Sequence, residues 1–227
     1  MIVFVVGLYK SGTSLIASML EEIGCESIVD RVATTKGLTR EYDIKESYFV
    51  NQLNNKILAT YSNAEIYFKN EDLPEVIDEA FTTLIRDFLA QLKGRTVFTK
   101  DPRFIGTLKY WIDNIPEGEQ YKIVYVDRED GLESSFRIDK WFNNKIVDGD
   151  YRRAIDSLKS NYYQTRSQFK GIEIDFDTQK KDQVKLGHLL YNFITQDFDT
   201  TYKVYFHNYF LPSKELTELF SKQTPGS

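Results

Sequence analysis

A glycine-containing loop near the N-terminus holds the residues with the clearest chemical meaning. It is the segment Gly7–Ser14, with the sequence GLYKSGTS, between the apolar run Ile2–Val6 and a helical pattern of apolar residues. In a strand–loop–helix context, glycines let backbone N–H groups turn inward, and the N-terminus of the helix adds positive potential. The segment therefore predicts an anion-binding loop. The alternative is a plain glycine turn between a strand and a helix.

The position of the cation in this loop indicates the kind of anion. In triphosphate-binding loops of the form GxxxxGK[ST], a lysine follows the second glycine and reaches the β- and γ-phosphates. Here Thr13 occupies that position, and the cation of the loop is Lys10. This arrangement favours a shorter anion than a triphosphate. We expect it to be held by the loop residues Lys10, Ser11, Gly12, Thr13 and Ser14.

Charged side chains also follow two further apolar runs that are typical of buried strands. Lys100-Asp101-Pro102-Arg103 comes after Thr96–Thr99, and Asp127-Arg128-Glu129-Asp130 comes after Tyr121–Val126. Open parallel sheets bind ligands beyond the carboxyl ends of their strands. We therefore expect Lys100 and Arg128 near the glycine loop. The alternative is that both are ordinary strand-end charges, solvated or paired with Asp101 and Asp127.

The alternation of strands and helices predicts an α/β fold with a mostly parallel sheet and helices on both faces. We expect one domain over residues 1–227, with a frayed tail at about 222–227. Expected strands are Ile2–Val6, Thr96–Thr99, Tyr121–Val126, Ile172–Phe176 and, at an edge, Tyr202–Phe206. Expected helices are Leu15–Ile23, Ile44–Ala59, Asp72–Leu92 with Pro74 in its first turn, Ile105–Ile112, Leu132–Phe142, Tyr151–Phe169 and Asp182–Ile194. The segment Glu26–Asp43 is polar and turn-like.

Composition excludes several classes of function. A formal net charge of −5 argues against a nucleic-acid partner, which requires a basic surface. The single cysteine, Cys25, and the two histidines speak against a disulfide framework and a metal site. The chain shows neither a signal peptide nor an apolar span, so we expect a cytoplasmic protein with no membrane partner. Its oligomeric state is not predicted.

Several segments together resemble the sulfotransferases that use 3′-phosphoadenosine 5′-phosphosulfate. Lys10-Ser11-Gly12-Thr13-Ser14 is similar to the first motif of that family, and Lys100, Pro102 and Arg103 are similar to a Lys-x-Pro-Arg segment of bacterial and carbohydrate-type members. The run Val124–Arg128, followed by Ser134 and Ser135, resembles a strand that ends in arginine with a serine about eight residues on. Weaker similarities cover Gly37–Leu58 and Ile172–Asp177.

The resemblance implies a P-loop-type three-layer sandwich and a transferase that moves a sulfuryl group to a hydroxyl of a carbohydrate or small molecule. Backbone N–H groups of Ser11–Ser14 and the Thr13 hydroxyl would bind the 5′-phosphate of the donor, without a metal. Lys10 would stabilise the leaving oxygen, and Lys100 would hold the sulfuryl oxygens. Arg128 with Ser135, or with Ser134, would bind the 3′-phosphate, although Ser135 follows Arg128 by seven residues rather than eight.

The catalytic base is the least defined part of the site. Many relatives have a histidine soon after the Lys-x-Pro segment, whereas this chain has Phe104. A carboxylate is the natural substitute, and Glu41 is the first candidate because it lies on the loop after the first helix. Glu46 and Asp43 are the next candidates. The alternative for each is a solvated loop acid.

Two other functions fit parts of the pattern. A small-molecule or nucleotide kinase with a degenerate loop would need magnesium, for which Asp127 is a strand-end ligand. A catalytically silent nucleotide-binding module would keep the fold without the chemistry. The absence of a histidine after Arg103 favours the silent module somewhat, while Thr13 argues against the kinase.

Overall fold

The computed structural model describes residues 1–28, 46–62, 68–128, 151–179, 182–196 and 203–204. Its centre is a six-stranded sheet with the order β2-β3-β1-β4-β5-β6, in which every adjacent pair of strands is parallel. The strands are β1 (Ile2–Gly7), β2 (Glu26–Ser27), β3 (Val97–Lys100), β4 (Tyr121–Asp127), β5 (Ile172–Asp175) and β6 (Lys203–Val204). This sheet confirms the α/β prediction.

The central strand β1 is buried on both faces. Phe4 belongs to one hydrophobic cluster with its even-numbered neighbours, while Val3 and Val5 belong to another. Successive side chains of a strand point to opposite faces, so a continuous apolar run supplies two cores at once. On its two sides β1 pairs with β3 and β4, which places the ends of all three strands together.

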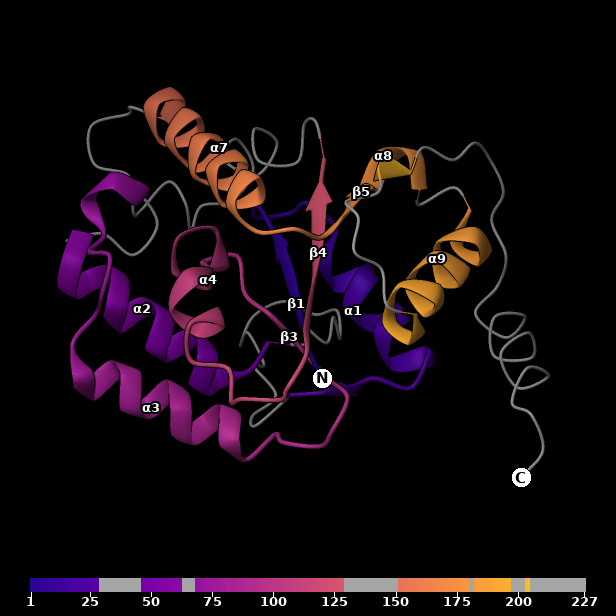
Figure 1. The fold of residues 1–227 in the computed structure, drawn as a ribbon. Coiled ribbons are helices and arrows are strands. Elements are labelled where there is room, and N and C mark those ends of the chain that lie inside the picture. The colour runs from indigo at the N-terminus through magenta and orange to yellow at the C-terminus, as the bar shows by residue number, and fades with distance from the viewer. Residues whose placement is uncertain (29–45, 63–67, 129–150, 180–181, 197–202, 205–227) are drawn as a thin grey trace, which may run out of the picture.

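Helices cover both faces of the sheet, which makes a three-layer α/β sandwich (Figure 1). The face that contains Phe4 packs against α2 (Tyr48–Ser62), α3 (Glu79–Ala90), α4 (Phe104–Ile112) and α7 (Tyr151–Gln168). The face that contains Val3 and Val5 packs against α1 (Thr13–Glu22) and α9 (Gln183–Thr195). The short helix α8 (Phe176–Gln179) follows β5 directly.

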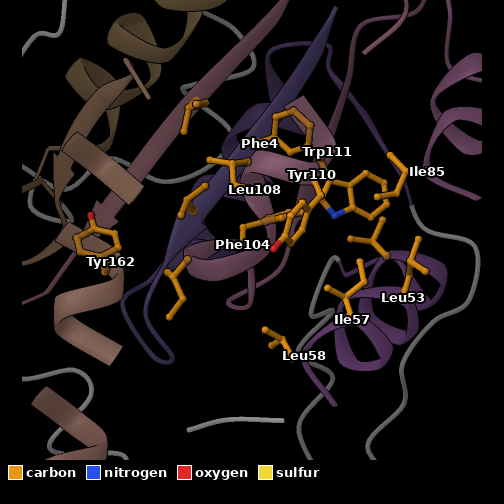
Figure 2. Packing of buried hydrophobic residues seen from close by; sticks show 14 of the residues in the cluster. Phe4, Leu53, Ile57, Leu58, Ile85, Phe104, Leu108, Tyr110, Trp111 and Tyr162 are labelled. Atoms are coloured by element: carbon orange, nitrogen blue, oxygen red, sulfur yellow. The ribbon is translucent and has the colours of Figure 1, made fainter. Parts of the chain in front are cut away.

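Aromatic side chains fill the larger core (Figure 2). The Trp111 ring meets the rings of Phe104 and Phe88 edge to face, and Phe104 meets Phe4 in the same way. The Trp111 indole Nε1 donates to Asn54 Oδ1 at 2.8 Å inside this core. Trp111 is therefore a core residue that positions α2 against α4.

The predicted helix Asp72–Leu92 is wrong at its start. Residues Asn70–Asp72 form a single 3-10 turn, and α3 begins only at Glu79. Leu73 is extended with ψ 137°, the conformation favoured before a proline. The Pro74 carbonyl accepts a hydrogen bond from Tyr110 Oη at 2.6 Å, so contact with α4 replaces a helical turn here.

Two more boundaries differ from the prediction. Helix α2 starts at Tyr48 rather than Ile44, because Ser47 Oγ accepts the Val50 N–H at 3.2 Å and caps the helix. Glu26 and Ser27, expected in a turn, form the edge strand β2 beside β3. The expected helix Leu132–Phe142 and the expected frayed tail lie outside the described residues.

Trp111→Phe should lower the free energy of unfolding by about 1–3 kcal/mol, because it leaves the buried Asn54 Oδ1 without its donor. Urea denaturation at pH 7 measures the loss. In the Trp111→Phe background, Asn54→Leu should lower the free energy of unfolding by less than it does in the wild type. The double variant leaves neither the indole donor nor the amide acceptor buried without a partner. Additive effects of the two substitutions would show that the hydrogen bond contributes nothing.

Candidate functional site

The glycine loop has the backbone of an anion-binding turn. Lys10 lies in the left-handed region with φ +62°, which is uncommon for a residue with a side chain, and Gly12 follows with φ +98°. Helix α1 begins at Thr13 directly after Gly12. The N–H groups of Thr13 and Ser14 open the helix, where they have no intrahelical acceptor. They are the natural donors to an anion at this position.

The interior of the loop is tightly packed. A Cβ on Gly7 would lie 2.5 Å from Ser11 Oγ and 2.8 Å from the Val126 carbonyl oxygen, so this position requires glycine. Ser11 Oγ is buried, and no hydrogen-bond partner for it lies among the described residues. The Ser11 N–H donates to the Leu8 carbonyl at 3.1 Å. An anion can therefore draw on the Ser11 hydroxyl and on the amides of the helix start, whereas the Ser11 amide is already engaged.

Lys100 is buried beside this loop, with 3% of its surface exposed. It ends β3, where it pairs in register with Val5 of β1, shortly before the loop begins. Its Nζ donates to Ser14 Oγ at 3.2 Å and to Glu46 Oε1 at 3.0 Å. The lysine thus joins the first turn of α1 to the residue that precedes the cap of α2. Sequence reasoning placed Lys100 near the loop, and the structure does bring them together.

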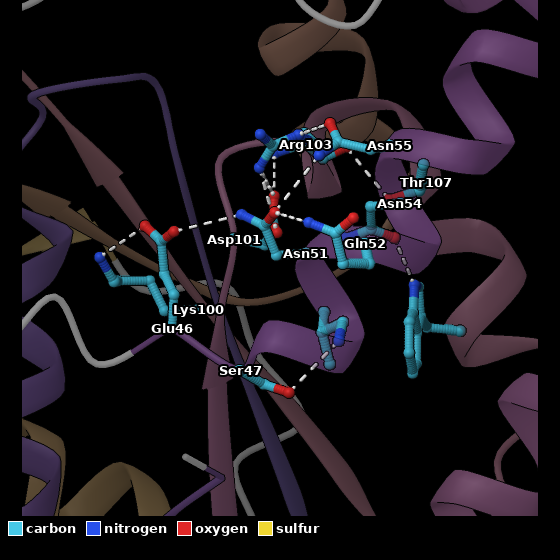
Figure 3. Close-up of polar contacts among 12 residues, drawn as sticks. Glu46, Ser47, Asn51, Gln52, Asn54, Asn55, Lys100, Asp101, Arg103 and Thr107 are labelled. Carbon is cyan, nitrogen blue, oxygen red and sulfur yellow. Dashed lines mark hydrogen bonds and ion pairs between the residues drawn. The ribbon is translucent and has the colours of Figure 1, made fainter. Parts of the chain in front are cut away.

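Glu46 is the described member of the three candidate bases, and it lies in this cluster (Figure 3). Its side chain is 20% exposed. Burial raises the pKa of Glu46 above its ordinary value and Asp101 adds to the increase, while Lys100 and Arg103 oppose it. Asn51 Nδ2 donates to Glu46 Oε2 at 3.4 Å. A carboxylate held in this way suits proton transfer, because a raised pKa brings a carboxyl closer to neutral pH.

The Arg103 side chain is buried and is bound by Asp101 and Asn55. Its Nη1 lies 3.1 Å from Asp101 Oδ1, and its Nε donates to Asn55 Oδ1 at 2.5 Å. The Asp101 carboxylate is buried and also accepts the Arg103 N–H at 2.8 Å. The structure therefore shows Arg103 paired with neighbouring residues.

Arg128 reaches the other side of the glycine loop. Its Nη1 donates to the Lys10 carbonyl at 3.3 Å, and its Nε lies 3.5 Å from Asp177 Oδ1. That Nε is buried and makes no hydrogen bond within the described part of the chain. The ring of Phe176 lies under the guanidinium and against Gly12, where a Cβ would meet it at 2.0 Å.

The structure therefore gathers Lys10, Ser11, Gly12, Thr13, Ser14, Lys100 and Arg128 at the carboxyl ends of β1, β3 and β4. The first-choice base Glu41, with Asp43, Ser134 and Ser135, lies outside the described residues. Sequence reasoning missed Asn51, Asn55 and Asp177. The spacing of Asn51 and Asn55 on a helix, and the place of Asp177 after β5, were signals that could have found them.

Two further searches cover only the ranges described above. Within them, no three or more histidine, cysteine, aspartate or glutamate side chains come together as a group that could hold a metal ion. Among the helices of those ranges, none combines the length and apolar character needed to cross a membrane.

Comparison with known proteins gives a distant structural likeness. No protein-family model matches the chain, and no curated protein matches it. Among solved structures, the chain is similar to the sulfotransferase domain of the Synechococcus PCC 7002 olefin synthase, with a TM-score of 0.45 and 15% sequence identity. The similarity covers 87% of this chain and 74% of that domain's chain. A likeness this distant does not establish a shared activity.

The raised pKa of Glu46 predicts a specific pH dependence of stability. Between the ordinary value of 4.5 and the higher pKa of the folded state, the folded protein binds more protons than the unfolded chain. The contribution of Glu46 to the free energy of unfolding must therefore fall as pH rises through this window. Urea unfolding of the wild type and of Glu46→Gln between pH 4 and 8 measures it.

In that comparison the wild type should lose stability relative to Glu46→Gln as pH increases. Glu46→Gln also removes the ion pair with Lys100, which shifts its free energy of unfolding by a constant amount. The test is therefore the slope, with pH, of the difference in free energy of unfolding between the two proteins. A difference that is flat with pH, or that rises, would contradict a raised pKa for Glu46.

Proposed function

We propose that the chain transfers a sulfuryl group from 3′-phosphoadenosine 5′-phosphosulfate to a hydroxyl of a carbohydrate or small-molecule acceptor. The observation that carries the proposal is the position of Lys100 between Ser14 of the glycine loop and the Glu46 carboxylate. This places an anion-binding turn, a cation and an acid of raised pKa within one hydrogen-bonded cluster. Transfer of an anionic group to a hydroxyl needs these three elements.

The residues of the loop fit a phosphate. Ser11 Oγ is a buried hydroxyl with no partner in the part of the chain that the structure describes, and the amides of Thr13 and Ser14 open α1. Thr13, in place of the lysine of triphosphate-binding loops, favours a monophosphate group bound without magnesium. On the far side of the loop, Arg128 Nε is buried and makes no hydrogen bond to the described residues, which suits it to a second phosphate such as the 3′-phosphate.

The donor supplies a sulfuryl group on a phosphate leaving group. Glu46, in its ionised form, accepts the proton of the acceptor hydroxyl as the new sulfur–oxygen bond forms. Lys10 neutralises the charge that develops on the bridging oxygen of the phosphate as the old bond breaks. Lys100 places a cation between the loop and Glu46, next to the oxygens of the group in transfer. Each preorganised donor of this kind contributes on the order of 3 kcal/mol to lowering a barrier.

Adenosine 3′,5′-bisphosphate should raise the melting temperature of the protein without added metal, and ATP should raise it much less. At 100 times its Kd, the bisphosphate should add roughly 2.7 kcal/mol to the free energy of unfolding. Differential scanning fluorimetry with and without magnesium measures both ligands. A larger shift with ATP and magnesium would favour a kinase and overturn the proposal.

Arg128→Ala serves as the matched variant for this binding assay. It should weaken binding of the bisphosphate far more than that of adenosine 5′-phosphate, because the residue is assigned to the 3′-phosphate. Equal losses for both nucleotides would show that Arg128 only supports the loop through the Lys10 carbonyl.

Lys10→Ala should reduce turnover more than donor affinity, because charge on the leaving oxygen develops only in the transition state. Glu46→Gln should lower kcat by about 10²–10⁴-fold, the usual contribution of a general base, and leave bisphosphate binding almost unchanged. The assay follows transfer of ³⁵S from the labelled donor to a panel of sugar and phenol acceptors. Near-normal turnover by Glu46→Gln would return the role of base to Glu41 or Asp43. Tight bisphosphate binding with no transfer to any acceptor would favour a silent nucleotide-binding module.

A further inference from the structure

A series of side-chain hydrogen bonds leads from the buried ion pair of Arg103 to Glu46 (Figure 3). Arg103 Nε donates to Asn55 Oδ1 at 2.5 Å, and Asn55 Nδ2 donates to Asn51 Oδ1 at 3.3 Å. Asn51 Nδ2 then donates to Glu46 Oε2 at 3.4 Å. The two asparagines are one helical turn apart on α2, which places their amides in line. We call Arg103, Asn55, Asn51 and Glu46 the amide relay.

The direction of the amide relay is set by Arg103. A guanidinium has only donors, so Asn55 must turn its carbonyl oxygen toward Arg103 and its NH₂ group toward Asn51. Asn51 must then accept with its oxygen, which leaves its own NH₂ group facing Glu46. Arg103 in turn cannot rotate freely, because both carboxylate oxygens of buried Asp101 lie within 3.3 Å of its Nη1. Gln52 Nε2 reinforces this direction, since it also donates to Asn51 Oδ1, at 3.5 Å.

We propose that Asn51 and Asn55 are positioning residues that keep a hydrogen-bond donor on Glu46 Oε2 and so hold this carboxylate ionised and oriented. Lys100 donates to the other oxygen, Oε1. Each oxygen of the carboxylate therefore accepts one hydrogen bond, one from the amide relay and one from the lysine. The inference rests on the proposed function only in that Glu46 acts there as the base. Donors to an ionised carboxylate favour its charged form.

The charged groups around Glu46 make this contribution necessary. Lys100 from β3 and Arg103 from the start of α4 favour the ionised form, while burial and Asp101 oppose it. Burial is the largest of these effects, and it raises the pKa of Glu46. A donor whose direction cannot reverse adds a fixed preference for the charged form, whereas a freely rotating amide could present its oxygen instead.

The test measures the pKa of Glu46 by NMR titration of ¹³C-labelled glutamate side chains in the free protein, with Glu46→Gln to assign the signal. Asn51→Ala should raise the pKa of Glu46, and Asn55→Ala should raise it by a smaller amount. Alanine is the best helix former, so both substitutions preserve α2. If Asn51→Ala does not fold, Asn51→Ser removes the same donor with a side chain too short to reach Glu46.

Asn114→Ala is the matched control. Asn114 Oδ1 also accepts from an arginine Nε, that of Arg86, at 2.9 Å, at the end of α4 and outside the glycine-loop cluster. The Asn114→Ala substitution should leave the pKa of Glu46 unchanged. A pKa of Glu46 that stays at the wild-type value in both Asn51→Ala and Asn55→Ala would overturn the proposal. A shift in Asn51→Ala alone would also overturn it, because Asn55 and Arg103 would then not orient the donor.

Kinetics provide the second measurement. Because the base acts in its ionised form, a higher pKa moves the acid limb of the kcat/KM profile to higher pH. Both variants should therefore lose activity mainly at low pH and regain it at high pH. An equal loss at every pH would indicate structural damage and overturn the positioning role. The NMR titration needs no turnover, so it tests the amide relay even if no sulfuryl transfer is found, and the two proposals can fail separately.

Discussion

A lysine ammonium buried at the carboxyl end of β3 is the constraint around which the candidate site is organised. Lys100 is almost wholly enclosed, and a buried charge without a partner would cost several kcal/mol. The structure compensates it with Ser14 from the start of α1 and Glu46 from the segment before α2. These two groups come from opposite layers of the sandwich. Satisfying one charge therefore ties the glycine loop, the central sheet and the α2 layer together.

The same requirement extends outward from Lys100. Glu46 is itself largely buried, so its second oxygen needs a donor, which Asn51 supplies. Asn51 and Asn55 have their amide directions set by Arg103, whose charge is balanced by Asp101. Each polar group in this set is buried only because the next one satisfies it. The result is a polar layer between α2 and the strand ends, beside an aromatic core into which Trp111 and Asn54 bring a buried hydrogen bond.

The two sides of the glycine loop differ in character. On the Lys100 side, charges are enclosed and mutually satisfied, which suits proton and charge transfer. On the Arg128 side, the guanidinium is partly exposed, with Phe176 beneath it and Asp177 at 3.5 Å. A partly exposed arginine with a buried Nε is suited to exchanging a neighbouring carboxylate for a phosphate. The loop thus lies between an enclosed set of paired charges and a partly exposed arginine.

Much of this could be predicted from the sequence because the signals are local. The apolar runs of β1 and β4 and the glycines of the loop depend on residues next to one another in the chain, and the structure has them as expected. The start of α3 could not be predicted, because its position depends on Tyr110 and Tyr61, which bond to Pro74 and Asp78 from other helices. The edge strand β2 is two residues long and exists only because β3 lies beside it.

The site divides in the same way. Local sequence predicted an anion-binding loop without the lysine of triphosphate-binding loops, and it predicted that Lys100 and Arg128 follow strands. Tertiary structure decided that Lys100 turns to Ser14 and Glu46, that Arg103 turns inward, and that Asn51 and Asn55 orient the acid. The physical reason is that a buried charge must be hydrogen-bonded or ion-paired, and the groups that come near it in the fold become its partners. Those partners lie up to 86 residues away along the chain, where no periodicity or motif spacing connects them.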